Sequence, residues 1–318
     1  MCTRVFENLY VACGTNTQAK ETGSCDLSKN CFKIRVKDTD RIISYVVDFC
    51  YEMVAAEENE RQSRIVVCPT RDDPRSIAEA CFYLGTYLIL YKGATYDAVV
   101  AAFSISDLSS HVDERNYKDN LDGWRALQHA MCLGWFVPPH SHAEPMMDVH
   151  ELAHYSHQAN GGVHLSVPGE LLFFPTPADL SEDREWADYT ADDGSIVRRF
   201  SARFYAELLQ DLDVSVVACL GTGSAAAAAA LAERGIEAVD LGLAADGSSL
   251  LRGLDALLSL ARAAPGALAV HSGAGRGWPR YAGPLVQALL MSRLGFDAGS
   301  AAAWVGMAGP RALSGAGR

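Results

Sequence analysis

Positively charged residues are scarce in this sequence. Its 318 residues include 27 Lys and Arg against 39 Asp and Glu, which gives a formal net charge of −12. Proteins that bind nucleic acids need clustered Lys and Arg to neutralise phosphates. The deficit therefore argues against a nucleic-acid partner and favours neutral or basic partners.

Three further absences concern the cellular compartment. The nine cysteines form no C-x-x-C pair and their number is odd, whereas secreted disulfide frameworks normally have an even number at close spacing. The first residues show no basic segment followed by an apolar one, so no signal peptide is predicted. The longest apolar run, Ala225 to Ala232, is too short to span a bilayer. We therefore expect a cytoplasmic protein without a membrane partner.

Short apolar strands alternate with helix-like segments along the chain. Arg64 to Cys68 predicts a strand, and Ser76 to Tyr91 predicts a buried helix. Ser76 is the expected N-cap of this helix, with Glu79 completing a capping box. Residues 214–271 repeat the order strand, helix, strand. This order predicts an α/β fold in which central sheets are flanked by helices.

The middle of the chain is less regular. Val163 to Phe174 predicts paired strands, and Ile196 to Leu209 has helical periodicity. The acidic stretch from Asp179 to Asp193 predicts a solvated loop. Trp186 and Tyr189 inside this stretch are an aromatic pair typical of a docking segment, so selection of basic peptide segments is the alternative interpretation.

The most informative segment has the sequence HSGAGRGW and begins at His271. Cysteine-dependent phosphatases have a His-Cys-x-x-Gly-x-x-Arg loop between a buried strand and a helix. His271 and Gly275 match this pattern, but Ser272 takes the place of the cysteine and Trp278 that of the arginine. Serine supplies no thiolate, and tryptophan cannot clamp phosphate oxygens. The loop is predicted to be catalytically degenerate, and Gly273-Ala274-Gly275 either forms a backbone nest for an anion or only closes a turn.

Several longer segments extend this similarity over most of the chain. They are ENLYVA (7–12), RIVVCPTRDDPRSIAEACFYLGTYLILYKGATYDAVVAAF (64–103), DVHELAHYSHQANGGVHLSVPGELLFFPTP (148–177), DLGLAADGSS (240–249) and ALAVHSGAG (267–275). In this order they resemble the cell-division-cycle-fourteen type of dual-specificity phosphatase. In that family an aspartate protonates the leaving group, and Asp246 stands at its position as a vestigial general acid.

The resemblance implies two tandem protein-tyrosine-phosphatase-like domains, each a central sheet flanked by helices, joined by a linker helix. It assigns residues 1–137 to an N-terminal domain without a catalytic loop and residues 138–162 to a linker that contains the helix. Residues 163–318 form the C-terminal dual-specificity-phosphatase-like domain with the degenerate loop.

These features together predict a pseudophosphatase without catalytic activity or cofactor that serves as a structural or scaffolding protein. By analogy with the family, we expect partners among cytoskeletal proteins or basic protein segments, in a ciliary, axonemal or centrosomal assembly. Two alternatives stay open. One is a dual-specificity phosphatase for phosphoserine, phosphothreonine or phosphotyrosine proteins, seen with an altered active site. The other is a module that binds phosphopeptides.

One motif points to different chemistry. His150, Glu151 and His154 form H-E-x-x-H, the zinc-protease signature of two helix-borne histidines and a glutamate base. A third ligand would have to come from His157 or His164. Because a bare pentapeptide is a weak signal and this one falls on the linker helix, no metal site is predicted and the three residues stay a weak candidate.

Overall fold

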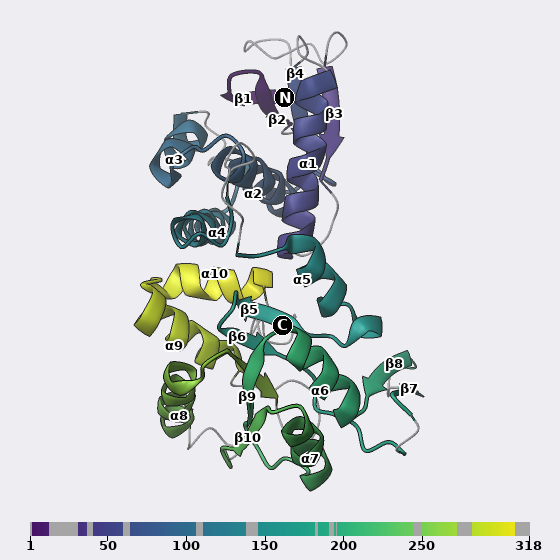
Figure 1. The fold of residues 1–318 in the computed structure, drawn as a ribbon. Helices are drawn as coiled ribbons and strands as arrows, with labels where there is room; N and C mark the ends of the chain where they lie inside the picture. Colours follow the sequence, from purple (N-terminus) through teal and green to yellow (C-terminus); the bar gives the residue numbers. More distant parts are fainter. Residues whose placement is uncertain are drawn as a thin grey trace. The chain divides into compact units, whose positions relative to one another are not determined.

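The chain divides into two compact units, Met1–Pro145 and Met146–Arg318, which are described separately (Figure 1). The computed structural model describes residues 2–12, 31–36, 41–59, 64–105, 111–137, 146–181, 184–190, 194, 196–243, 250–271 and 282–308. The predicted linker helix is α5 (Val149–Ser156), which lies in the second unit. The division into two domains and a linker over 138–162 stays a prediction.

The first unit combines a four-stranded sheet with four described helices. They are β1 (Cys2–Phe6), β2 (Leu9–Ala12), β3 (Cys31–Arg35), α1 (Ile43–Asn59), β4 (Arg64–Cys68), α2 (Pro74–Leu90), α3 (Tyr96–Ile105) and α4 (Glu114–Cys132). The strand order is β1-β2-β4-β3, and β4 runs parallel to both of its neighbours. Helix α2 is apolar nearly all round, which explains why it is buried between its neighbours α1 and α4.

The start of α2 differs from the sequence prediction. Ser76 is not the N-cap; Asp73 is, because its carboxylate accepts the Ser76 N–H at 2.8 Å while Pro74 occupies the first turn. The helix therefore begins two residues earlier than predicted. Glu79 does not complete a capping box but forms an ion pair with Arg41 at 3.0 Å.

The second unit is built on a five-stranded sheet. Its elements are α5, η2 (Gln158–Asn160), β5 (His164–Val167), β6 (Leu171–Phe173), β7 (Trp186–Thr190), β8 (Ile196–Phe200), α6 (Ala202–Asp211), β9 (Val214–Cys219), α7 (Ala225–Glu233), β10 (Glu237–Asp240), α8 (Leu250–Ala263), β11 (Ala267–His271), α9 (Ala282–Leu294) and α10 (Ala298–Ala308). The order is β10-β9-β11-β6-β5, parallel except for β5. Figure 1 shows α6 and α7 on one side of this sheet and α8 and α9 on the other. The predicted α/β class is confirmed.

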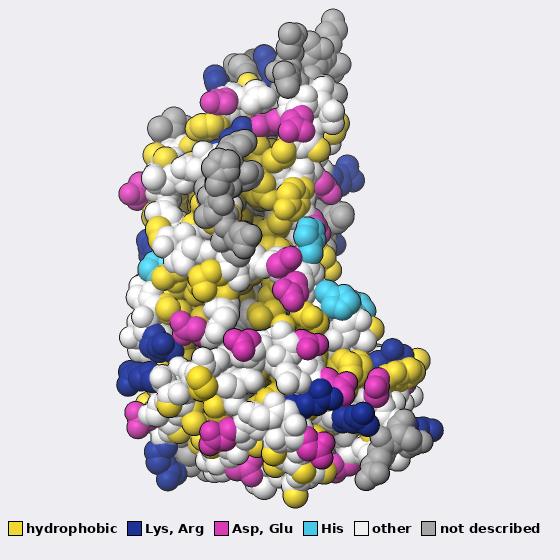
Figure 2. Space-filling view, in the orientation of Figure 1, with side chains coloured by type: hydrophobic (Ala, Val, Ile, Leu, Met, Phe, Trp, Pro, Cys, Tyr) yellow, Lys and Arg dark blue, Asp and Glu magenta, His cyan; other side chains and the backbone are white. Residues whose placement is uncertain are grey.

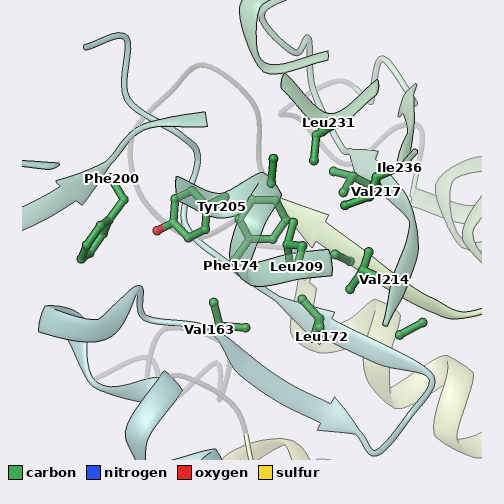
Figure 3. Packing of buried hydrophobic residues seen from close by; sticks show 13 residues of the cluster. Val163, Leu172, Phe174, Phe200, Tyr205, Leu209, Val214, Val217, Leu231 and Ile236 are labelled. Atoms are coloured by element: carbon green, nitrogen blue, oxygen red, sulfur yellow. The ribbon is translucent and has the colours of Figure 1, made fainter. Parts of the chain in front are cut away.

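One face of this sheet packs against α6 through a dense apolar cluster (Figure 3). The Phe174 and Tyr205 rings lie 5.0 Å apart near its middle, and the Tyr205 hydroxyl donates to the Gly161 carbonyl at 2.7 Å. Towards α7 the packing changes, because six consecutive residues of that helix are alanine and Leu231 is its one large apolar side chain. The sheet is thus well covered by α6 and thinly covered by α7.

Strands β7 (Trp186–Thr190) and β8 (Ile196–Phe200) pair antiparallel, and this pair is here called the hairpin; the sequence predicts a loop followed by a helix at these positions. The helix prediction for 196–209 is wrong over its first six residues, since β8 pairs with β7 through Ile196 and Val197 and Ser201 is the N-cap of α6. Helix α6 begins only at Ala202, after the Ser201 hydroxyl accepts the Phe204 N–H at 3.2 Å.

Stacked cations stabilise this hairpin at the surface. The Arg198 guanidinium lies 3.7 Å from the Trp186 ring centre and donates to both Asp188 carboxylate oxygens, at 2.8 and 3.1 Å. Basic, acidic and apolar side chains accordingly lie together over β7 and β8 at the lower right of Figure 2. No described helix has the length and apolar character needed to cross a membrane.

Candidate functional site

Three polar side chains lie in one row at the carboxyl end of the parallel strands of the second unit. Asp240, Cys219 and His271 are the last residues of β10, β9 and β11. Cys219 is in register with Asp240 on one side and with His271 on the other. Side chains at the same register of a parallel sheet point to the same face, so the three form a row, here called the Asp–Cys–His row. Ligand sites of open α/β sheets lie at this edge.

His271 ends the central strand β11 as a buried, neutral side chain. Its side chain and backbone are 4% exposed, and the ring lies 5.0 Å from the Phe174 ring. Burial lowers the pKa of His271 to about 4, against a smaller opposite effect of Asp240. Its carbonyl accepts the Leu220 N–H at 2.9 Å, which fixes the end of β11 against β9.

Cys219 is a protonated thiol rather than a nucleophile. Burial raises its pKa to about 11, and the Asp240 carboxylate, which accepts a hydrogen bond from the thiol, contributes in the same direction. A thiol with this pKa is almost entirely protonated at neutral pH.

Asp240 also holds the turn that leads from β9 into α7. Its Oδ1 accepts the Gly223 N–H at 3.0 Å, and a Cβ atom added to Gly223 would come 2.8 Å from the same oxygen. The Ser224 hydroxyl then caps α7 by accepting the Ala227 N–H at 3.1 Å. The close approach of the carboxylate explains why a glycine stands at position 223.

A cavity of about 410 Å³ lies between this row and α7. Its described lining consists of Val217, Cys219, Gly223, Ser224, Ala225, Ala227, Ala228, Leu231, Ala238, Val239, Asp240 and His271. Most of these residues are small or apolar, and Asp240 is the exposed member of the Asp–Cys–His row. The sequence could suggest His271 but not its partners, because the register that brings Asp240 and Cys219 beside it is a property of the sheet.

The predicted catalytic positions are mostly outside the described residues. This applies to Ser272, Gly273, Ala274, Gly275, Trp278 and Asp246. His271 is described, and it stands where the sequence expects the loop to begin, at the end of a buried strand that precedes α9. The roles assigned to these residues remain predictions.

The zinc-protease motif lies on the short helix α5. His150 and Glu151 occupy its first turn, where both backbone N–H groups donate to Asp148. His154 faces the Asn160 amide, with its Nδ1 atom 3.3 Å from Nδ2. Within the described part of the chain, no group of three or more His, Cys, Asp or Glu residues is placed to hold a metal ion.

Comparison with known proteins points to phosphatases. No protein-family model matches the chain. Over 253 residues it is 26% identical to dual specificity protein phosphatase CDC14C of Symphalangus syndactylus, a match that covers 76% of this chain and 47% of the relative. The chain thus spans about half the length of the curated relative. The match supports the resemblance to the cell-division-cycle-fourteen type of phosphatase.

Two solved structures of P. aeruginosa TpbA are also similar, though weakly. The first, in complex with pTyr, has a TM-score of 0.27 and 20% sequence identity and covers 42% of this chain and 83% of TpbA. The second has a TM-score of 0.25 and 20% identity, with 38% and 78% of the two chains covered. Similarity at this level assigns no role to any residue of the chain.

Proposed function

We propose that this chain, a distant relative of the dual-specificity phosphatases of the cell-division-cycle-fourteen type, is a pseudophosphatase that does not hydrolyse phosphate esters. The observation that carries the proposal is the pair of residue identities that follows His271. Ser272 stands where the nucleophilic cysteine is expected, and Trp278 stands where the phosphate-clamping arginine is expected. Each change removes a separate part of the chemistry, so their combination is a stronger argument than either alone.

Serine at position 272 needs a general base, and the described neighbours supply a poor one. His271 is the adjacent imidazole, but with a pKa near 4 it is too weak a base to take a proton from a serine hydroxyl. Cys219, in the neighbouring strand, cannot replace the missing thiolate, because its pKa of about 11 keeps the sulfur protonated. The pKa values of His271 and Cys219 thus both support the proposal that the chain lacks a catalytic nucleophile.

Tryptophan at position 278 removes the charge that binds the substrate. A guanidinium donates two parallel hydrogen bonds to phosphate oxygens and neutralises the charge that develops during transfer. An indole has one N–H donor and no charge. A simple Cys-to-Ser exchange would leave this arginine in place, so Trp278 favours a pseudophosphatase over an enzyme altered only at its nucleophile.

The test is phosphatase activity toward p-nitrophenyl phosphate in the wild type, Ser272→Cys, Trp278→Arg and the double variant, each with its fold checked by circular dichroism. We expect no turnover above buffer in the wild type or in Ser272→Cys, because the arginine is still missing. Turnover by the wild type would refute the proposal. Turnover by Ser272→Cys alone would favour the alternative of a phosphatase with an altered nucleophile.

We further propose that the chain serves as a scaffolding protein whose partners carry basic segments. The net charge of −12 supports such partners, and the cytoskeletal setting rests on analogy with the family. Salt and detergent fractionation of the native cell, followed by mass spectrometry, tests this role. We expect the chain in the insoluble cytoskeletal fraction at an abundance comparable with its neighbours. A scarce and freely soluble chain would contradict it, and phosphate-dependent capture of peptides would favour the phosphopeptide-binding alternative.

A further inference from the structure

We propose that the cavity between α7 and the carboxyl ends of β9, β10 and β11 binds a small organic cation, a primary ammonium group on a compact apolar body. The proposal goes beyond the pseudophosphatase proposal and does not rest on it. It concerns residues of the described sheet and of α7, not the segment that begins at Ser272. Three observations carry it: the space, the charge of its lining and the arrangement of the α7 N-terminus.

The space follows from the sequence of α7. Protein interiors are normally filled to the density of organic crystals, and a hollow of about 410 Å³ is within the usual range of ligand sites. Here Ala227 and Leu231 of α7 face Val217 of β9, and these three side chains are buried. The alanine run leaves this part of the sheet face without the larger side chains that fill it beside α6.

The lining has a single sign of charge. Among its described residues the lining holds one acidic side chain, Asp240, and no Lys or Arg, while burial keeps Cys219 protonated and His271 neutral. Asp240 is exposed, whereas Cys219 and His271 are buried, so the Asp–Cys–His row runs from the open side of the cavity inward. A ligand with its ammonium group at Asp240 would place its apolar part against Ala227 and Leu231.

Two N–H groups at the start of α7 already have side-chain acceptors. Helix N-termini attract anions through their free N–H groups and the helix dipole. At α7 the Asp240 carboxylate already accepts the Gly223 N–H, and the Ser224 hydroxyl accepts the Ala227 N–H. A phosphate entering the cavity would meet the negative charge of Asp240. We therefore expect Asp240 to disfavour in this cavity the anions that phosphatase loops bind.

Three small probes of similar size test the charge preference directly. They are 2-phenylethylammonium, 2-phenylethanol and phenyl phosphate, titrated into the intact chain by calorimetry and checked by ligand-observed NMR. We expect the ammonium probe to bind at least about tenfold more tightly than the alcohol, and phenyl phosphate to show no competition with it. Equal binding of cation and alcohol, absence of ammonium binding at millimolar concentration, or displacement by phenyl phosphate would each overturn the proposal.

Two variants locate the binding, and a third is the control. Asp240→Asn removes the charge but keeps an oxygen that can accept the Gly223 N–H, and we expect at least about tenfold weaker ammonium binding. Ala227→Leu adds bulk at a lining residue outside the Asp–Cys–His row, and we expect a similar loss. Glu237→Gln removes a charge from the same strand outside the lining, and binding should be unchanged.

The outcomes separate this proposal from the one on catalysis. Unchanged ammonium binding in Asp240→Asn refutes the site even if the chain proves inactive toward phosphate esters. Should Asp240→Asn fail to fold, Ala227→Leu decides, because unchanged binding in that variant means that the probe binds elsewhere. Phosphatase activity in the wild type would overturn the pseudophosphatase proposal and leave the cation site standing.

Discussion

Trp124 of α4 lies so close to Gly85 of α2 that a Cβ atom added to the glycine would come 2.3 Å from Trp124 Cε2. The indole Nε1 donates to the Phe82 carbonyl at 3.0 Å, and the Trp124 side chain is fully buried. The hydrogen bond to the backbone of α2 keeps the ring from moving away. The absence of a side chain at Gly85 is thus what allows α2 and α4 to pack at this point.

Gly85→Ala is therefore expected to destabilise the first unit, although alanine is the better helix former. Overpacking costs about 1–3 kcal/mol, more than the gain of about 1 kcal/mol in helix propensity. Urea denaturation followed by tryptophan fluorescence measures the change. Gly306→Ala in α10 is the matched control, since nothing among the described residues lies within 4 Å of the added Cβ, and it should be neutral or slightly stabilising. A stabilised Gly85→Ala would show that Trp124 can move away.

Tyr205→Phe is expected to cost about 1 kcal/mol of unfolding free energy in the second unit. The substitution removes the hydroxyl that donates to the buried Gly161 carbonyl at 2.7 Å and keeps the ring contacts with Phe174. Tyr189→Phe on the exposed hairpin should change stability by less than about 0.5 kcal/mol. Equal effects of the two changes would mean that the Gly161 carbonyl finds another donor.

Asp73→Ala should destabilise α2 by about 0.5–2 kcal/mol, because Asp73 is its N-cap. The hydrogen bond from the Ser76 backbone N–H holds the pKa of Asp73 below its usual value of 3.8. The folded state thus binds a proton less readily than the unfolded state. The stabilisation by the Asp73 carboxylate is therefore complete above pH 3.8 and is lost as the pH falls below that value. Thermal unfolding of wild type and variant should converge at low pH. A constant difference down to pH 2 would contradict the cap.

Acid should destabilise the second unit through two histidines of its sheet, the buried His271 and the half-buried His164. Burial lowers the pKa of both His164 and His271 from 6.5 to about 4. Between these values the unfolded chain is protonated and the folded chain is not, so stability is present above pH 6.5 and falls as pH drops toward 4. Each shift corresponds to at most about 3 kcal/mol.

Chemical denaturation at several pH values measures this predicted acid sensitivity of the second unit. His271→Gln should make the fall in stability between pH 6.5 and 4 shallower, and the double variant with His164→Gln shallower still. NMR of the wild type should show both imidazoles neutral at pH 5.5. An unchanged slope in the double variant would mean that other groups cause the acid sensitivity.

The alternation of strands and helices could be predicted from the sequence because it depends on local patterns. Buried strands such as β11 are short apolar runs, and the order of elements in the second unit follows from them. The hairpin could not be predicted in this way, since Ile196 and Val197 fit a helical period and a strand equally well. What decides for the strand is pairing with Tyr189 and Thr190, which is not a local property.

The candidate site was predictable only in part for the same reason. A phosphatase-like motif identified His271, and the end of β11 is where the structure places it. Cys219 and Asp240 carry no motif, and they join His271 through strand register alone. Ser76 illustrates a smaller failure, because Asp73, three residues earlier, caps α2 instead and Pro74 favours this earlier start.

The alanine run of α7 has a consequence for how the helix is oriented. If the helix rotated about its own axis by about 100°, the angle between consecutive residues, each alanine of 225–230 would be replaced on the sheet side by the methyl group of another alanine. The methyl groups alone therefore do not distinguish one rotation from the next. Two chemically distinct anchors do so, the Ser224 cap at the start and the buried Leu231 near the end. Shortening Leu231 would therefore weaken the preference for one rotation, while the Ser224 cap would still mark where the helix begins.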